Sequence, residues 1–257
     1  MSSLVLYEER DSVGIITLNN PEKRNALTKE MIVEIRRLLE RIGDEKKVKV
    51  VVLRGEGKGF CSGHYYEDVL QEGIKDVYDV FTECGKMFRT LKEIPQVTIA
   101  SVHGFAAGAG CQLVGACDLA VAEEGTLFMT PGIKFGFFCA TPGVYVSRNL
   151  SRKRAAEMLF TGEPIDANKA YEWGLINRIA PRGKLMEVTM ELASLITRFS
   201  LNVISLGKRL FHSQLDMGEL EALEYASNLI VVNAKMEDAK EGIKAFLEKR
   251  EPIWKER

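Results

Sequence analysis

Short apolar runs rich in β-branched residues alternate with segments of helical period along the first half of the chain. The runs have the length of buried strands and lie at Val13–Leu18, Val48–Leu53, Val97–Val102 and Leu119–Ala122. Helix-period segments separate the first three runs. Because parallel strands need a crossover between them, this alternation predicts βα units and an α/β fold with mainly parallel strands.

The first helix is predicted to begin at Thr28, whose hydroxyl can accept a hydrogen bond from a free N–H group of the first turn. Apolar residues recur at helical spacing at Met31, Ile32, Ile35, Leu38 and Leu39. We expect this stripe to face the sheet.

From about Ser151 onward the pattern is helical, and strand signals almost vanish. The predicted helices are Arg152–Phe160, Asp166–Trp173, Lys184–Phe199, Glu219–Val232 and Asp238–Lys249. Asp238 and Glu241 have the spacing of a capping box. The sequence therefore predicts a core over residues 1–195 and a helical C-terminal region over residues 196–257, which packs back on the core or joins subunits.

Composition and charge restrict the classes of partner. A chain of 257 residues with 46% hydrophobic residues can bury one sizeable core. Its 35 basic and 36 acidic residues leave a net charge of -1, which gives no case for nucleic acid or an anionic membrane as a partner. No stretch approaches the roughly 20 apolar residues that a bilayer requires, and residues 1–11 lack the pattern of a signal peptide. We therefore expect a cytoplasmic protein.

The cysteines show the spacing of neither a disulfide framework nor a zinc site. There are five of them, at Cys61, Cys84, Cys111, Cys117 and Cys139. An odd number without a CxxC pair predicts reduced thiols and no metal site.

Two glycine-rich segments each follow a predicted strand directly. They are Gly55–His64 (GEGKGFCSGH) and Gly104–Gly115 (GFAAGAGCQLVG). Glycine lets a backbone approach a ligand closely, and small residues that open a helix leave its first N–H groups free for an anion or a developing oxyanion. Tight turns and close packing would also explain these glycines. Neither segment is a phosphate loop or a dinucleotide fingerprint, so nucleotide binding is not expected.

A series of segments in a fixed order resembles the crotonase superfamily, also called the enoyl-CoA hydratase/isomerase family. The segments are NPEKRNAL at Asn20–Leu27, FCSGH at 60–64, VHGFAAGAGCQLVGACDLAVA at 102–122, FMTPGIKFG at Phe128–Gly136, EMLFTGEPIDANKAYEWGLINRI at 157–179 and FLEKREPIW at Phe246–Trp254. The resemblance covers nearly the whole chain. It implies a crotonase-like spiral of ββα units, a C-terminal helical region that builds homotrimers or homohexamers, and an acyl-CoA thioester as substrate with no separate cofactor.

The resemblance also implies an oxyanion hole made of two backbone N–H groups, which fall on His64 and Ala109. Removing one such donor from a dry pocket typically costs about 10²–10³ in rate. The residues implied to contact the acyl-CoA are Arg24, Ala26, Ser62, His64, Tyr65, Ala109, Gly132, Phe246 and Lys249.

The residues that move protons in hydratases of the family are replaced in this sequence. Two glutamates of those enzymes correspond to Gln112 and Gly132, which keep the family's separation of 20 residues. Gln112 has no titratable proton but can orient a water molecule, and Gly132 has no side chain. Each acid or base commonly contributes about 10²–10⁴ in rate, so efficient hydration is not expected. A third position, which carries Asp or Tyr in related isomerases, dehalogenases and decarboxylases, falls on Ala140.

Three candidates remain for proton or covalent chemistry. His64 has a pKa range suited to proton transfer, although its imidazole can also merely pack. Cys139 offers a thiol nucleophile or an inert buried side chain. Glu67 and Asp68 are the nearest carboxylates in the sequence, and a solvated helix face also explains them.

The region implied to hold the CoA phosphates also departs from the family. Glu67 falls where many relatives place a lysine, and Tyr65 replaces a common aspartate. The cations left for this role are Lys23, Arg24 and Lys249.

Some further side chains are given a structural or pocket-lining role. We interpret His103 and His212 as structural. Phe137, Phe138 and Tyr145 would line an apolar acyl pocket, although core packing explains them equally well.

Three hypotheses of function follow. The first is an enzyme, a lyase or isomerase of this family, that acts on an acyl-CoA thioester through the oxyanion hole. The second is decarboxylation of a malonyl-type CoA, which needs an enolate-stabilising hole and less acid/base machinery. The third is an acyl-CoA-binding or interaction module without catalysis.

Overall fold

The computed structural model describes residues 3–70 and 73–256. The strands are β1 (Val5–Arg10), β2 (Val13–Leu18), β3 (Val50–Gly55), β4 (Val97–Val102), β5 (Phe105–Ala107), β6 (Leu119–Glu123), β7 (Leu127–Met129), β8 (Ile165–Asp166) and β9 (Arg178–Ala180). The helices are α1 (Lys29–Glu45), α2 (Tyr66–Val69), α3 (Ile74–Glu93), α4 (Ala109–Ala116), α5 (Ala140–Asn149), α6 (Arg152–Thr161), α7 (Ala167–Trp173), α8 (Leu185–Thr197), α9 (Leu201–Gln214), α10 (Glu219–Asn233) and α11 (Glu237–Glu248). Two 3-10 helices, η1 (Pro21–Lys23) and η2 (Pro131–Phe135), complete the elements of the described chain.

The strands form two sheets, and the chain passes repeatedly from one to the other. The larger sheet has the order β1-β2-β3-β4-β6-β9 and the smaller one β5-β7-β8. Within the larger sheet only β1 runs antiparallel to its neighbour. The chain goes from β4 to β5 and then α4, and again from β6 to β7 and then α5. This repeated strand, strand, helix order confirms the predicted spiral of ββα units.

Several strands and the first helix lie where the sequence pattern predicts them. The predicted strands at Val13–Leu18 and Val97–Val102 are β2 and β4, and β3 begins two residues later than predicted. The Thr28 hydroxyl accepts a hydrogen bond from the Met31 N–H at 3.2 Å and caps α1, as predicted. The whole predicted apolar stripe of this helix is buried.

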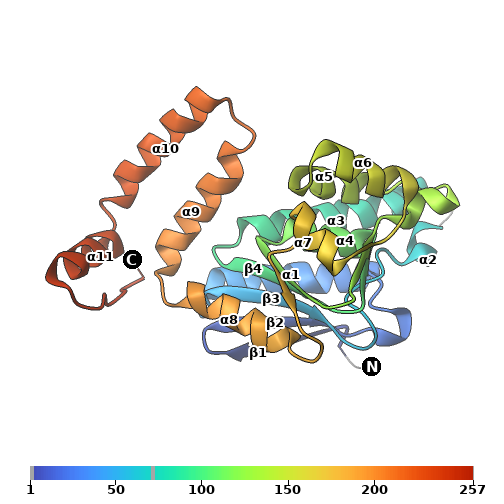
Figure 1. Cartoon of the computed structure of the whole chain (residues 1–257), viewed down its shortest axis with the longest axis horizontal. Helices are drawn as coiled ribbons and strands as arrows, with labels where there is room; N and C mark the ends of the chain where they lie inside the picture. Colours follow the sequence, from blue (N-terminus) through green and yellow to red (C-terminus); the bar gives the residue numbers. More distant parts are fainter. Residues whose placement is uncertain (1–2, 71–72, 257) are drawn as a thin grey trace.

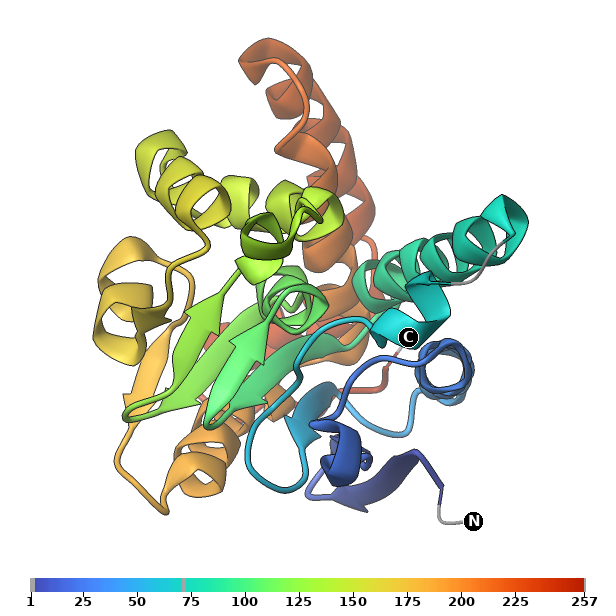
Figure 2. The same ribbon diagram turned by 90° about the vertical axis from the view of Figure 1, so that its right-hand side faces the viewer.

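Helices cover both faces of the larger sheet. One face packs with α1, α3 and α4 in the main core, and the other packs on α8 in a smaller apolar cluster. Figure 2 shows α8 beneath the strands and α4 above them. Strands buried on both faces explain the continuous apolar runs in the sequence.

The last three helices, α9, α10 and α11, extend away from the sheets (Figure 1). Helix α9 begins at the Ser200 N-cap and contains His212, but no bounds were predicted for it. The predicted boundary between residues 195 and 196 falls inside α8, the helix that packs on the sheet.

The predicted capping box at the start of the last helix is wrong. Helix α11 begins at Glu237 after Met236, which makes no side-chain capping bond. Asp238 is fully buried and instead accepts hydrogen bonds from the Ser200 hydroxyl at 2.6 Å and the Lys255 N–H at 2.6 Å. Its carboxylate thus fastens the C-terminal segment to the start of α9, a contact that the spacing of Asp238 and Glu241 does not reveal.

Candidate functional site

The first wall of the site is a loop held between two neighbouring segments. After β3, Cys61 pairs with Ala106 of β5, and the Ala107 N–H donates to the Cys61 carbonyl at 2.9 Å. On the other side the Leu27 N–H donates to the Gly63 carbonyl at 2.7 Å. These bonds fix the backbone of the loop.

Two glycines bring the N–H groups of His64 and Ala109 into one place. Gly63 has φ 100° and Gly108 has φ 51°, a region that glycine adopts most readily. A Cβ on Gly63 would lie 3.0 Å from the Ala107 carbonyl oxygen and 3.3 Å from the Ala109 nitrogen, so the two backbones are in contact. Ala109 opens α4, where N–H groups lack an intrahelical acceptor. Within the described chain, neither the His64 N–H nor the Ala109 N–H donates to a protein acceptor.

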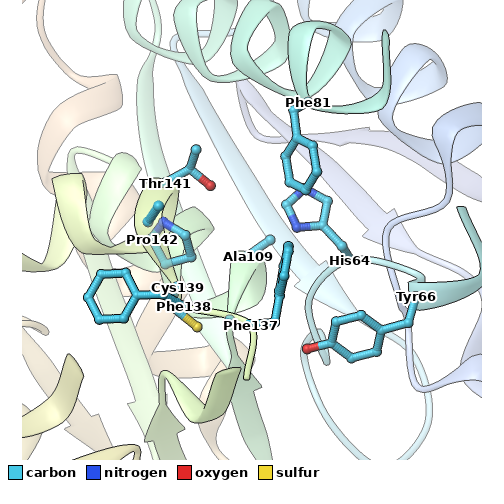
Figure 3. Close-up of a pocket in the computed structure, with 11 residues that line it drawn as sticks. His64, Tyr66, Phe81, Ala109, Phe137, Phe138, Cys139, Thr141 and Pro142 are labelled. Atoms are coloured by element: carbon cyan, nitrogen blue, oxygen red, sulfur yellow. The ribbon is translucent and has the colours of Figure 1, made fainter. Parts of the chain in front are cut away.

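A pocket of about 280 Å³ opens beside these two donors (Figure 3). The backbone at positions 108 and 109 lines one side of it, and the rings of Phe81, Phe137 and Phe138 line others. Because the walls are mostly apolar, an oxygen placed at the donors would be shielded from water. Hydrogen bonds to a developing negative charge are stronger in such surroundings.

The His64 imidazole lines this pocket but is largely buried. Its Nε2 lies 3.3 Å from the Cys84 sulfur, and its ring stacks edge-on to Phe81 with the centroids 4.8 Å apart. Burial lowers the pKa of His64 to about 4 and raises the pKa of the Cys84 thiol to about 12. The pair is therefore a neutral imidazole and a neutral thiol at pH 7, not an activated nucleophile.

Tyr66 and Cys139 also line the pocket. Tyr66, from α2, packs edge-on against Phe135 and Phe137, with centroids 5.3 Å and 6.3 Å away. Burial raises the pKa of Tyr66, and so does the nearby Cys139. Cys139 precedes α5, and burial also raises the pKa of its thiol. Tyr66 was not predicted as a site residue, because a four-residue helix has no period that would show which face it presents.

Gln112 and Gly132 are not among the residues that line the pocket. The Gln112 side chain is buried, and its Oε1 has no hydrogen-bond partner among residues 3–70 and 73–256. At Gly132 an added Cβ would overlap the Phe137 carbonyl oxygen and lie 3.0 Å from the Cys139 sulfur. The backbone of the loop thus fills the space in which a side chain at position 132 would begin.

The residues predicted to bind the CoA end fall into two groups. Arg24, Ser62 and Tyr65 lie together: the Ser62 N–H donates to the Arg24 carbonyl at 3.1 Å, and Lys23 Nζ lies 3.9 Å from the centre of the Tyr65 ring. Ala26 is buried beside them. Lys23 and Arg24 therefore place two cations at this edge of the site.

Phe246 and Lys249 form the second group, at the end of α11. Figure 1 shows α11 at the opposite end of the molecule from α2 and α3, which flank the pocket. The single chain does not bring these two residues to the site.

The remaining candidates make structural contacts. His103 Nε2 lies 2.9 Å from the Gly57 carbonyl oxygen, and His212 Nε2 lies 2.8 Å from Asp118. The Asp68 carboxylate accepts a hydrogen bond from the Lys29 N–H at the start of α1. Tyr145 packs against the core and is not part of the pocket wall.

Residues 3–70 and 73–256 contain neither a metal-binding cluster nor a membrane-spanning helix. No group of three His, Cys, Asp or Glu side chains there has the arrangement of a metal site. No helix in the same residues combines the length and apolar character needed to cross a bilayer.

The sequence matches the family model described as Enoyl-CoA hydratase/isomerase over residues 8–257. The chain belongs to this family. It is a divergent member, because both glutamate positions are replaced.

Curated relatives and solved structures resemble nearly the whole chain. Enoyl-CoA hydratase domain-containing protein 3, mitochondrial, of Homo sapiens is 42% identical over 95% of this chain and 81% of its own length. The putative enoyl-CoA hydratase of Thermus thermophilus is 33% identical over 95% and 98%. The crystal structure of an enoyl-CoA hydratase from Mycobacterium smegmatis superposes with a TM-score of 0.95 at 36% identity, covering 98% of this chain and 99% of that one. The crystal structure of human enoyl Coenzyme A hydratase domain-containing protein 3 superposes with a TM-score of 0.94 at 40% identity, covering 98% of this chain and 100% of that one.

The predicted cytoplasmic location is contradicted by these relatives. Five of them, at 38–42% identity, are named as mitochondrial proteins. A targeting segment sets location and the folded body does not, so the composition of the fold carried no information on this point.

Proposed function

We propose that the protein binds an acyl-CoA thioester and stabilises the negative charge that develops on the thioester oxygen. The observation that supports this is the pair of free N–H groups of His64 and Ala109 beside an apolar pocket. Two fixed donors beside the same pocket can hold an oxyanion and bind its charge without reorganising. The names of the relatives supply the class of substrate.

Efficient hydration does not fit this pocket. No carboxylate lines it within the described chain, and neither Gln112 nor Gly132 is part of its lining. Because each of two acid/base groups commonly contributes about 10²–10⁴ in rate, we expect crotonyl-CoA hydration to be slower than in a two-glutamate hydratase by at least about 10².

Replacement of Ala109 by proline tests the donor pair. Ala109 is the first residue of α4, a position that tolerates proline, and Ala109→Pro removes the N–H. We expect butyryl-CoA to bind at least about tenfold more weakly by calorimetry, and any thioester turnover to fall by about 10²–10³. The matched control is Ala109→Ser, which keeps the N–H and should behave like the parent protein.

The fold of Ala109→Pro is checked by circular dichroism and thermal unfolding. Equal butyryl-CoA affinity in a folded Ala109→Pro protein and in the parent would show that the two N–H groups do not hold the thioester.

Decarboxylation of a malonyl-type CoA is a second candidate function, and the protic groups of the pocket favour it. Proton abstraction needs an effective base, whereas the Tyr66 phenol and the Cys139 thiol are held neutral by their raised pKa, and the His64 imidazole with its pKa of about 4 is a weak base. Loss of carbon dioxide leaves an enolate with no base involved. Release of carbon dioxide from methylmalonyl-CoA would support this candidate, and binding of acyl-CoA without any turnover would favour the binding module instead.

A further inference from the structure

An enolate formed in this pocket has to receive a proton at Cα before the product can leave. Four side chains with a transferable proton or a hydroxyl line the pocket, namely His64, Tyr66, Cys139 and Thr141. The proposed function does not say which of them is the donor, and the contacts of these side chains separate them.

Three of the four are unsuited to the task. The Thr141 hydroxyl is too weak an acid for general acid catalysis. His64 carries no acidic proton at neutral pH, because burial favours the neutral imidazole, and its Nε2 is already in contact with the Cys84 sulfur. Cys139 is a buried thiol packed against the backbone of Gly132, so it has little access to solvent for renewal of its proton.

Tyr66 differs from these in its position and in its access to water. Its ring is held edge-on by Phe135 and Phe137, while 44% of the residue stays exposed. Figure 3 shows its hydroxyl directed into the pocket beside Phe137, on the same side as His64. The hydroxyl oxygen therefore faces the substrate space, and the exposure of the residue leaves its side chain within reach of water.

We propose that Tyr66 is the proton donor of this site and serves a 2-carboxyacyl-CoA thioester. This inference rests on the proposed function. The bond between Cα and the carboxylate carbon breaks, carbon dioxide leaves, and the electron pair passes into the thioester enolate, whose oxygen is held by the N–H groups of His64 and Ala109. The Tyr66 O–H then delivers its proton to Cα, and the tyrosinate takes a proton from water.

Tyr66→Phe is the direct test, because it removes the hydroxyl and keeps the ring that packs on Phe135 and Phe137. With malonyl-CoA and methylmalonyl-CoA as probes, we expect kcat for carbon dioxide release to fall by about 10²–10⁴ with KM unchanged. The matched control is Tyr78→Phe on α3, an exposed tyrosine outside the pocket, which should keep the parent's rate.

A pH profile separates an acid from a packing residue. A tyrosine donor stays protonated from about pH 6 to about pH 9, so kcat should be flat there and fall only at higher pH. That fall should be missing from the residual activity of Tyr66→Phe. A purely structural role would lower the rate equally at all pH values.

The possible outcomes test the role of Tyr66 and the proposed function separately. If Tyr66→Phe releases carbon dioxide at the parent's rate while Cys139→Ala does not, the thiol is the donor and the inference is overturned. If the parent protein binds butyryl-CoA but releases no carbon dioxide from either probe, the inference fails and the proposed function stands. If the protein binds no acyl-CoA, both fail.

Discussion

His64 shows how one residue contributes two separate groups to a site. Its backbone N–H is free beside the pocket, whereas its imidazole is enclosed by Cys84 and Phe81. The backbone donor does not depend on the charge of the ring. Substrate binding and titration of His64 should therefore be separable.

The lowered pKa of His64 predicts a loss of stability in acid. Between the ordinary pKa of 6.5 and the folded value of about 4, the unfolded chain binds a proton that the folded chain does not. The free energy of unfolding should thus have its full value above pH 6.5 and fall by up to about 3 kcal/mol as the pH drops to 4. Urea unfolding of the parent and of His64→Leu at pH 7 and pH 4.5 measures this, since the variant lacks this contribution. An imidazole pKa near 6.5 by NMR would contradict it.

At the scale of elements, the segment that follows β7 decides what chemistry the site can do. Helix η2 and the chain up to α5 place the Phe137 carbonyl where a side chain at Gly132 would begin. The path of the backbone therefore leaves no room for a glutamate side chain at position 132. The difference from the hydratases thus involves the whole loop as well as the identity of this residue.

Gly132→Ala should be destabilising, because the Cβ forces the Phe137 carbonyl to move. We expect the free energy of unfolding to fall by about 1–3 kcal/mol, as for overpacking in a core. Gly85→Ala is the matched control, since its Cβ would meet open space in the interior of α3 and should stabilise the helix by about 0.5–1 kcal/mol. Equal unfolding midpoints for the two variants would contradict this account.

Restoration of both glutamates should not restore hydration. In Gln112→Glu/Gly132→Glu the second side chain starts from a position that the loop occupies, so the two carboxylates cannot flank a water as in a hydratase. We expect crotonyl-CoA hydration to stay within about tenfold of the parent's rate, because a misplaced acid or base contributes little. A gain of about 10² or more would show that the loop adapts freely.

On the scale of the whole molecule, a largely buried cluster of charged and polar side chains joins α9 to the core. Asp118 lies 2.9 Å from Lys208 and 2.8 Å from His212, both on α9, and accepts a hydrogen bond from the Thr98 N–H of β4. Burial alone would raise the pKa of Asp118, but the His212 hydrogen bond and the Lys208 charge outweigh it and lower the pKa.

Removal of Lys208 should strongly destabilise the protein, because it leaves the Asp118 carboxylate buried without its main cation. We expect Lys208→Met to lower the free energy of unfolding by about 3–5 kcal/mol. Lys240→Met on the exposed face of α11 is the control and should change it by less than about 0.5 kcal/mol. Similar changes in the free energy of unfolding for the two variants would contradict a stabilising role of this cluster.

The C-terminal helices also predict self-association. Phe211, Leu220 and Leu223 of α9 and α10 are 57%, 82% and 63% exposed in the single chain, and large apolar side chains exposed on neighbouring helices are typical of protein interfaces. Light scattering should give a trimer or hexamer of the 28.8 kDa chain, and Leu220→Glu/Leu223→Glu should dissociate it. A monomeric parent protein at micromolar concentration would contradict this prediction.

The sequence by itself determined those features whose signal is local. Short apolar runs predicted β2 and β4, and the helical period of 3.6 residues predicted α1 with its buried face. The replacement of two glutamates by Gln112 and Gly132 is likewise visible from the residue types at these two positions. The fixed order of the motifs then indicated the family and its ββα spiral.

Only the tertiary structure decided which groups share the pocket. Tyr66 and Phe81 come from α2 and α3, and no spacing between them and Ala109 announces that they meet. The same holds for Asp238, whose partners Ser200 and Lys255 lie far from it along the chain. Long-range contacts depend on how whole elements pack, because burial and charge act between atoms that are near in space whatever their separation in the sequence.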